Sequence, residues 1–265
     1  MRPLFFGSAT RKLYGVYQPA SGPPPRSTRA QGVVLCYPGV QEYNTSHPAF
    51  RKLAGLLSRA GLHVLRFDYF GTGDSSGEMH EGTPEDWVED VRTAVAELKE
   101  LAGIRLVSLV GYRLGAALAA LAVSTGVKVE DLVLWDPVVT GPEYVSVLEF
   151  RDRQENLLLI HPTSRFERGK TEILGYPFSP ALRASLERLD LRKVDTTLAQ
   201  RLVLVATEER KEYSDLRAAL ASAREVSYSF VPEDAGAANR SAREEILLVT
   251  KVLGAIRDEM AGATP

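Results

Sequence analysis

The chain has 265 residues, a length that suits one large α/β domain as well as two smaller domains. Hydrophobic residues make up 45% and charged residues 25%, an ordinary globular composition that excludes a disordered or fibrous chain. The 32 Lys and Arg residues nearly balance the 34 Asp and Glu residues, so the net charge of −2 argues against a nucleic-acid partner. One cysteine, Cys36, excludes an intrachain disulfide framework and a cysteine-cluster metal site.

Neither a membrane helix nor a secretory signal is expected. The longest apolar stretches, such as Ala116–Val123, are far shorter than the ~20 residues of a membrane span. The first residues hold no apolar segment long enough for a signal peptide. We therefore expect a cytoplasmic protein without membrane insertion.

Short apolar runs alternate with amphipathic stretches along most of the chain. Leu4–Phe6 and Leu13–Tyr17 predict an antiparallel hairpin, followed by a surface loop over Ser21–Arg29. Apolar runs predict strands over Gly32–Tyr37, His63–Phe67, Arg105–Val110, Val129–Trp135, Leu202–Ala206 and Val226–Val231. Helical spacing predicts helices over Pro48–Ala60, Thr83–Leu101 (capped by Thr83), Arg113–Val123, Tyr213–Ala223 and Ala242–Ile256. This alternation predicts an α/β fold with a mostly parallel sheet and helices on both faces.

Residues 137–200 interrupt the alternation. They contain helical fragments at Tyr144–Gln154 and Pro180–Leu189, and a stretch without clear periodicity at Leu157–Ile173. Ligands bind at the carboxyl ends of the strands in open α/β sheets, so an insertion of this length is interpreted as a lid over those ends. The predicted core is then residues 1–136 and 201–265.

A sharp turn is predicted between the strand Arg105–Val110 and the next helix. Its sequence, Gly111-Tyr112-Arg113-Leu114-Gly115, has the spacing of the G-x-S-x-G nucleophile elbow, with arginine at the centre. With Leu35–Gly39 (LCYPG) and Arg66–Ser75 (RFDYFGTGDS), it makes the chain resemble the α/β-hydrolase superfamily. The resemblance is nearest to the serine-aminopeptidase-like branch, including hydrolases associated with exosortase systems, some of which share the R-L-G-A and W-D-P-V-V segments found at Arg113–Ala116 and Trp135–Val139.

The resemblance implies an α/β-hydrolase fold but not its usual catalysis. Arginine stays protonated and offers only hydrogen-bond donors, so Arg113 cannot replace the attacking serine. The family's histidine follows the last strand, whereas His47, His63, His80 and His161 all precede Leu202. An acid at Glu208 or Glu209 would have no imidazole to orient. A Ser-His-Asp mechanism is therefore excluded.

The cation at the elbow has two interpretations. Arg113 can bind a carboxylate, acyl or phosphate group of a small molecule, in a pocket that also involves Tyr112, the N–H of Leu114, and the loop at Gly39 and Val40. Alternatively, Arg113 closes the pocket through an internal ion pair with Glu42 or Asp136, which avoids a costly unpaired buried charge. The two interpretations are compatible if a ligand joins the pair.

Other candidate residues also have structural alternatives. Glu42 or His47 can serve as general acid or base, and Asp136 is a candidate site residue by its position at a strand end. The alternative is a helix entry in which Asn44 turns the loop and Ser46 or His47 caps the helix before Pro48. Cys36 fits a buried core position better than a catalytic thiol. The residues from Asp68 to Ser75 fit a structural turn.

The leading hypothesis is a pseudoenzyme, a degenerate hydrolase that binds an acidic or acyl-bearing small molecule near Arg113. The second is an active hydrolase, thioesterase or lyase with Arg113 as clamp and Glu42 or His47 as acid–base. The third is an interaction module that uses its lid to contact a partner protein or a second copy of the chain. None of the three requires a metal or a cofactor.

Overall fold

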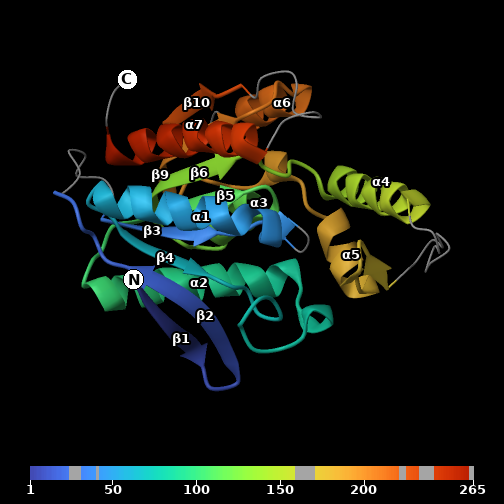
Figure 1. The fold of residues 1–265 in the computed structure, drawn as a ribbon, viewed down its shortest axis with the longest axis horizontal. Coiled ribbons are helices and arrows are strands. Elements are labelled where there is room, and N and C mark those ends of the chain that lie inside the picture. The colour runs from blue at the N-terminus through green and yellow to red at the C-terminus, as the bar shows by residue number, and fades with distance from the viewer. Residues whose placement is uncertain (24–30, 40–41, 159–170, 221–224, 233–241, 263–265) are drawn as a thin grey trace.

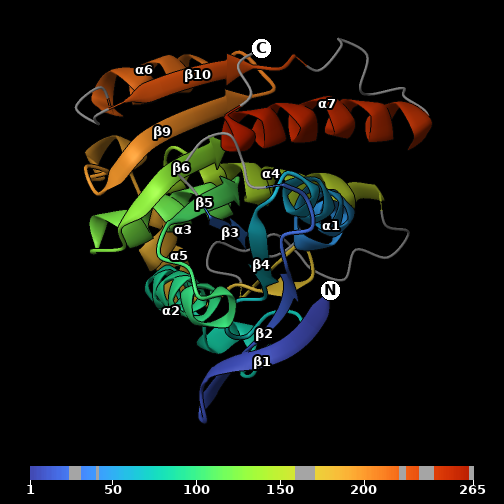
Figure 2. The same ribbon diagram turned by 90° about the vertical axis from the view of Figure 1, so that its left-hand side faces the viewer.

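The structure, a computed structural model, describes residues 1–23, 31–39, 42–158, 171–220, 225–232 and 242–262. Within these residues an eight-stranded sheet forms the centre of the molecule (Figures 1 and 2). In spatial order its strands are β1 (Arg2–Ser8), β2 (Arg11–Gln18), β4 (His63–Phe67), β3 (Gly32–Cys36), β5 (Val107–Tyr112), β6 (Val129–Trp135), β9 (Ala199–Ala206) and β10 (Val226–Phe230).

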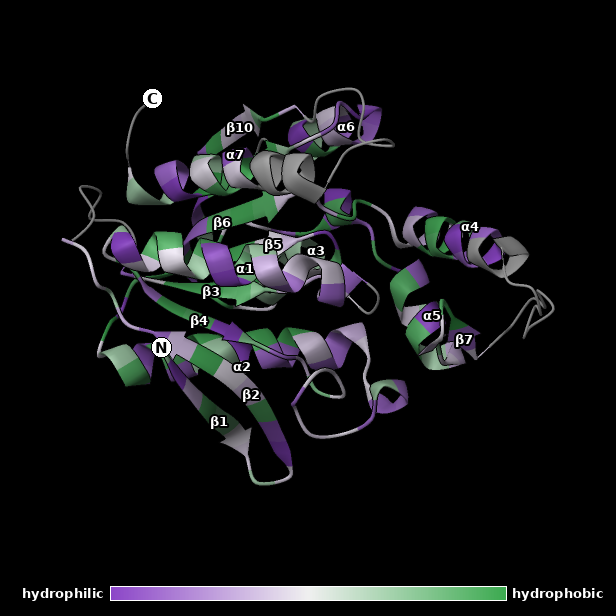
Figure 3. Ribbon diagram, in the orientation of Figure 1, coloured by the Kyte–Doolittle hydropathy of each residue, from purple (hydrophilic) through white to green (hydrophobic). Residues whose placement is uncertain are grey.

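The sheet is mostly parallel, as predicted. β1 pairs with β2, and β2 with β4, in antiparallel register, and the other pairs are parallel. The predicted hairpin is confirmed, and β4 and β6 have the predicted bounds. All five residues of β3 are buried, and β3 and β6 are mostly hydrophobic (Figure 3), because helices cover both faces of a parallel sheet.

Helices pack on both faces of the sheet (Figure 2). α1 packs against α7 on one face, and α2 packs against α3 on the other. Their bounds are α1 (Glu42–Arg59), α2 (Pro84–Ala102), α3 (Leu114–Ser124), α6 (Lys211–Ala219) and α7 (Ala242–Ala261). The predicted cap of α2 is confirmed, because Thr83 Oγ1 accepts a hydrogen bond from the Asp86 N–H at 3.3 Å. In the described part of the chain, each helix is too short or too polar to cross a bilayer.

The prediction that the first long helix begins at Pro48 was wrong. α1 begins at Glu42, so Asn44, Ser46 and His47 lie in its first turns rather than in a loop or cap. The Ser46 hydroxyl donates to the Tyr43 carbonyl at 3.0 Å, as a side chain inside a helix does. Proline removes only one helical hydrogen bond, and Glu42 and Ser46 are buried, so tertiary packing keeps the residues before Pro48 helical.

The described residues between β6 and β9, 136–158 and 171–198, form an insert. Its elements are α4 (Gly141–Leu158), β7 (Glu172–Ile173), β8 (Tyr176–Pro177), α5 (Pro180–Glu187) and the 3₁₀ turn η2 (Leu191–Lys193). Both predicted helices are confirmed with shifted ends, and most of the stretch without clear periodicity lies outside the described residues. In Figure 1 the arrows of β3 and β6 point toward the side of the molecule where α4 and α5 lie. That this insert works as a lid stays a prediction.

Candidate functional site

The turn between β5 and α3 consists of the single residue Arg113. Its backbone has φ 53° and ψ −119°, a conformation that residues other than glycine rarely adopt. The Arg113 N–H donates to the Trp135 carbonyl at 3.0 Å, and the Arg113 carbonyl accepts from the Val138 N–H at 3.2 Å. The end of β6 therefore holds the sharp turn that the G-x-x-x-G spacing predicts.

The two glycines of the turn are required by close packing of the backbone. A Cβ atom on Gly115 would lie 2.1 Å from the Tyr37 carbonyl oxygen. One on Gly111 would lie 2.4 Å from the Gly115 carbonyl oxygen. The chain thus retains the steric conditions of a nucleophile elbow, although no nucleophile stands at its centre.

Arg113 forms an ion pair with Glu42, the first residue of α1. Arg113 Nε lies 3.2 Å from Glu42 Oε1, and the two side chains are only 12% and 11% exposed. From α4 of the insert, the Tyr144 hydroxyl donates to the other carboxylate oxygen at 3.4 Å. Burial lowers the pKa of Arg113, but the Glu42 carboxylate and the neighbouring tyrosines raise it by more than burial lowers it. The pKa is therefore raised overall, and the guanidinium stays charged. Of the two partners considered from the sequence, Glu42 is the one that contacts it.

Asp136 ties β6 to the residue after β9 instead. Its carboxylate accepts hydrogen bonds from the Thr207 N–H at 2.8 Å and from the Thr207 hydroxyl at 2.7 Å. Burial raises the pKa of Asp136, although the bonds from Thr207 and the charge of Arg113 act in the opposite direction. Asp136 therefore lies within electrostatic range of Arg113 but has its hydrogen bonds elsewhere.

The predicted oxyanion loop lies against the elbow. A Cβ atom on Gly39 would come within 2.6 Å of Leu114 Cδ2, and the Gly39 carbonyl accepts from the Glu42 N–H at 3.1 Å. Leu114 is fully buried at the start of α3. The Tyr112 ring packs 4.3 Å from that of Trp135, and Val40 lies outside the described residues. The structure thus brings together Gly39, Leu114 and Arg113, as the resemblance implied.

The other two candidates have different surroundings. The His47 ring stacks on that of Tyr37, and its Nε2 lies 3.5 Å from Arg66 Nη1. Burial and the nearby Arg66 lower the pKa of His47, so the ring is neutral near pH 7. Burial raises the pKa of Cys36 to about 12, which leaves its thiol protonated and inert.

Sequence reasoning missed Tyr144, Thr207 and Arg210. Tyr144 lies 102 residues from Glu42 in the chain, and no local pattern connects the two. Arg210 stands at the start of α6 and pairs with Glu208 at 2.8 Å and with Glu212 at 3.3 Å. Arg210 lies just after β9, in the segment where the resemblance to α/β-hydrolases places the catalytic acid, so this position could have identified it from the sequence. Glu208 forms a surface ion pair there.

Two cavities lie beside these residues. The one that Arg113 lines has a volume of about 20 Å³, room for one water molecule, and Tyr144, Glu143, Arg210 and Glu212 also line it. A second cavity, of about 340 Å³, adjoins Gly39 and extends to Tyr176 of the insert. Among the described residues, no group of three or more His, Cys, Asp or Glu side chains is arranged to hold a metal ion.

The fold is that of solved α/β-hydrolase structures. A putative hydrolase from Agrobacterium vitis S4 is 18% identical, with a TM-score of 0.62 over 97% of each chain. Est1E from Butyrivibrio proteoclasticus is 14% identical, with a TM-score of 0.64 over 98% of this chain and 99% of its own. Alpha/beta hydrolase domain-containing protein 10 from mouse is 15% identical, with a TM-score of 0.60 over 98% of this chain and 100% of its own.

The sequence also matches a family profile. Residues 28–202, more than half of the chain, match the family described as serine aminopeptidase, S33. No curated protein sequence matches the chain. The chain therefore belongs to the serine aminopeptidase, S33, family of α/β-hydrolases.

Proposed function

We propose that this family member does not catalyse hydrolysis through a serine nucleophile and acts instead as a pocket protein for a small molecule. The observation that supports this most is the buried ion pair between Arg113 and Glu42 at the centre of the elbow. A guanidinium has no lone pair with which to attack a carbonyl. The sequence also contains no histidine after His161, although the catalytic histidine of the family follows the last strand.

An acidic or acyl-bearing ligand at Arg113, as predicted from the sequence, would have to share the guanidinium with Glu42. The Leu114 N–H at the start of α3 would add a donor for its negative charge. The neighbouring cavity of about 20 Å³ is far smaller than a small-molecule site of ~300–1,000 Å³. Binding at this point therefore requires Glu42 or Tyr144 to move.

A non-serine enzyme is the second candidate, with Arg113 as clamp and Glu42 as acid–base. Two observations weigh against it. Glu42 is the proposed base, and both of its carboxylate oxygens already accept hydrogen bonds, one from Arg113 and one from Tyr144. Nε2 of His47, the other proposed acid–base, faces Arg66. We therefore favour the non-catalytic function.

Covalent labelling and turnover test this proposal together. The purified full chain is treated with a serine-directed fluorophosphonate and assayed with p-nitrophenyl acetate and with an acyl thioester. We expect no stoichiometric label and no turnover above that of Arg113→Ala. Arg192→Ala, which removes an arginine from an exposed ion pair, is the matched control. Stoichiometric labelling of a serine would refute the proposal. Turnover that Glu42→Gln and Arg113→Ala abolish, and Arg192→Ala does not, would establish the second candidate instead.

A further inference from the structure

The cavity beside Gly39 is the larger of the two next to the elbow. Its volume of about 340 Å³ falls in the lower part of the range of small-molecule sites, ~300–1,000 Å³. Tyr43 of α1, Tyr69 after β4, Trp87 of α2 and Tyr176 of β8 contribute to its lining. Four aromatic residues from four separate segments thus line one space, three of them from the core and one, Tyr176, from the insert.

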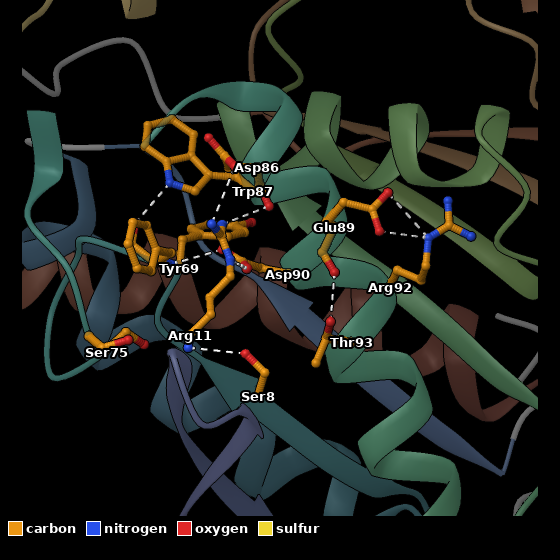
Figure 4. A network of polar contacts seen from close by, with 12 residues as sticks. Ser8, Arg11, Tyr69, Ser75, Asp86, Trp87, Glu89, Asp90, Arg92 and Thr93 are labelled. Carbon is orange, nitrogen blue, oxygen red and sulfur yellow. Dashed lines mark hydrogen bonds and ion pairs between the residues drawn. The ribbon is translucent and has the colours of Figure 1, made fainter. Parts of the chain in front are cut away.

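The wall formed by Tyr69 and Trp87 is held in place by a buried network (Figure 4). Trp87 Nε1 donates to the Phe70 carbonyl at 3.0 Å, and the Phe70 N–H donates to Asp90 at 2.9 Å. The Asp90 carboxylate, almost fully buried, also accepts a hydrogen bond from Arg11 Nε at 2.9 Å. The hairpin β1–β2 and helix α2 thereby hold the Trp87 ring and the backbone beside Tyr69 in place, so this wall is formed before any ligand arrives.

The polar groups of the wall are directed toward protein partners. The Tyr43 hydroxyl donates to Asp68 at 2.8 Å, and the Tyr69 hydroxyl to the Tyr37 carbonyl at 3.3 Å. The Thr72 hydroxyl donates to the Tyr69 carbonyl at 2.8 Å. Tyr69 and Trp87 are almost fully buried, so what remains available to a ligand is mainly the half-buried rings of Tyr43 and Tyr176 and aliphatic surface. This surface favours a planar apolar body.

The charges at this cavity differ from those beside Arg113. Of the lining residues that the structure describes, Glu78 is the only charged one, and it is exposed at the rim. An anionic ligand would lose hydration here without gaining a cationic partner among these described lining residues. A cation, in contrast, would meet aromatic faces and a carboxylate.

The insert closes one side of the cavity. Asn44 Nδ2 of α1 donates to the Tyr176 hydroxyl of β8 at 3.2 Å, so one hydrogen bond joins core and insert at the cavity. Gly71 and Gly73 lie opposite in the loop after β4, with φ of 75° and 53° that side chains rarely adopt.

We propose that this cavity is the ligand site of the protein, and that its ligand is a small molecule with a planar apolar body and no negative charge. The inference rests on the proposed function, since it names the class of molecule that the pocket protein binds. It departs from the acidic ligand expected at Arg113.

Three probes with one ring system and different charges test the proposal: 2-naphthylmethanol, 2-naphthylmethylammonium and 2-naphthoate. Isothermal titration calorimetry of the full chain is expected to show 1:1 binding of the alcohol and the ammonium ion. Binding of the naphthoate should be weaker by about tenfold or more, because its charge is desolvated without a partner. Equal or tighter binding of the naphthoate, or no binding of any probe at about 1 mM, would overturn the proposal.

Variants locate the site. Tyr176→Ala should weaken binding of the alcohol by about three- to tenfold, the value of one aromatic contact. Met79→Trp, which fills the cavity from the 3₁₀ turn η1 (Met79–Glu81), should abolish it. Tyr228→Ala, at a different cavity beside α6, is the matched control and should bind as the wild type does. Circular dichroism confirms that each variant folds.

Two further outcomes separate the inference from the proposed function. Loss of binding in Arg113→Ala, with retention in Tyr176→Ala and Met79→Trp, would place the ligand at the elbow and overturn the inference. Fluorophosphonate labelling tests only the proposed absence of a serine nucleophile, so the labelling test and the binding test can fail independently of each other.

Discussion

The loss of stability on removal of the Glu42 charge should measure how strongly the buried ion pair with Arg113 stabilises the fold at the elbow. At 3.2 Å between Arg113 Nε and Glu42 Oε1, an effective dielectric constant of about 20 gives an attraction of about 5 kcal/mol. Breaking a buried pair costs ~3–5 kcal/mol, because the remaining charge has no partner. Both side chains keep slight exposure and glutamine retains an acceptor oxygen, so we expect Glu42→Gln to lower the free energy of unfolding by about 2–4 kcal/mol.

A double-mutant cycle separates the pair from its surroundings. Arg113→Met in the Glu42→Gln background should recover most of the lost stability, since an apolar pair of similar size often replaces a buried ion pair without cost. Urea unfolding of the four proteins gives the coupling energy, which we expect to exceed about 1.5 kcal/mol. Glu89→Gln, which breaks an exposed pair with Arg92, serves as control and should change stability by less than about 0.5 kcal/mol. A coupling energy below about 0.5 kcal/mol would show that the ion pair does not stabilise the elbow.

Three further predictions concern single residues. Gly115→Ala should destabilise the fold by more than about 3 kcal/mol, because its Cβ would lie 2.1 Å from a backbone oxygen. Gly254→Ala, whose Cβ would have no atom within 4 Å, should be neutral or stabilising in thermal unfolding. Similar melting temperatures for the two variants would contradict this prediction. Burial raises the pKa of Cys36 to about 12, so iodoacetamide should not modify its thiol in the native protein at about pH 8 and should react fully with it in guanidinium. One equivalent of label on the native protein would disprove this prediction. Burial and the neighbouring Glu143 raise the pKa of Glu212, so its contribution to stability is present below the ordinary glutamate pKa and is lost as pH rises through the raised value. Glu212→Gln should therefore gain stability relative to wild type between about pH 4 and pH 8 in urea unfolding, and a pH-independent difference would refute the argument.

Features encoded by neighbouring residues could be predicted from the sequence. Buried strands such as β4 and β6 have the expected ends, because an apolar run bounded by polar residues defines a strand locally. The cap of α2 at Thr83 is a signal of four residues. The elbow around Arg113 was also predictable, since glycine spacing reports how closely a strand and a helix must pack.

The start of α1 shows where local signals fail. Pro48 is a usual first helical residue, and a cap before it was the natural expectation. In the structure the helix begins six residues earlier, because burial of Glu42 against the elbow stabilises those turns. A contact with a residue 71 positions away decided the boundary.

What the sequence alone determined is the fold class and the glycine-flanked turn with arginine at its centre, because both follow from residue types at short spacing. Only the tertiary structure decided that Arg113 pairs with Glu42 rather than Asp136, that Tyr144 joins them, and that an aromatic cavity lies beside Gly39. Each of these depends on side chains from segments far apart in the chain. Their meeting is set by how the helices and the insert pack on the sheet, and no periodicity in the sequence records it.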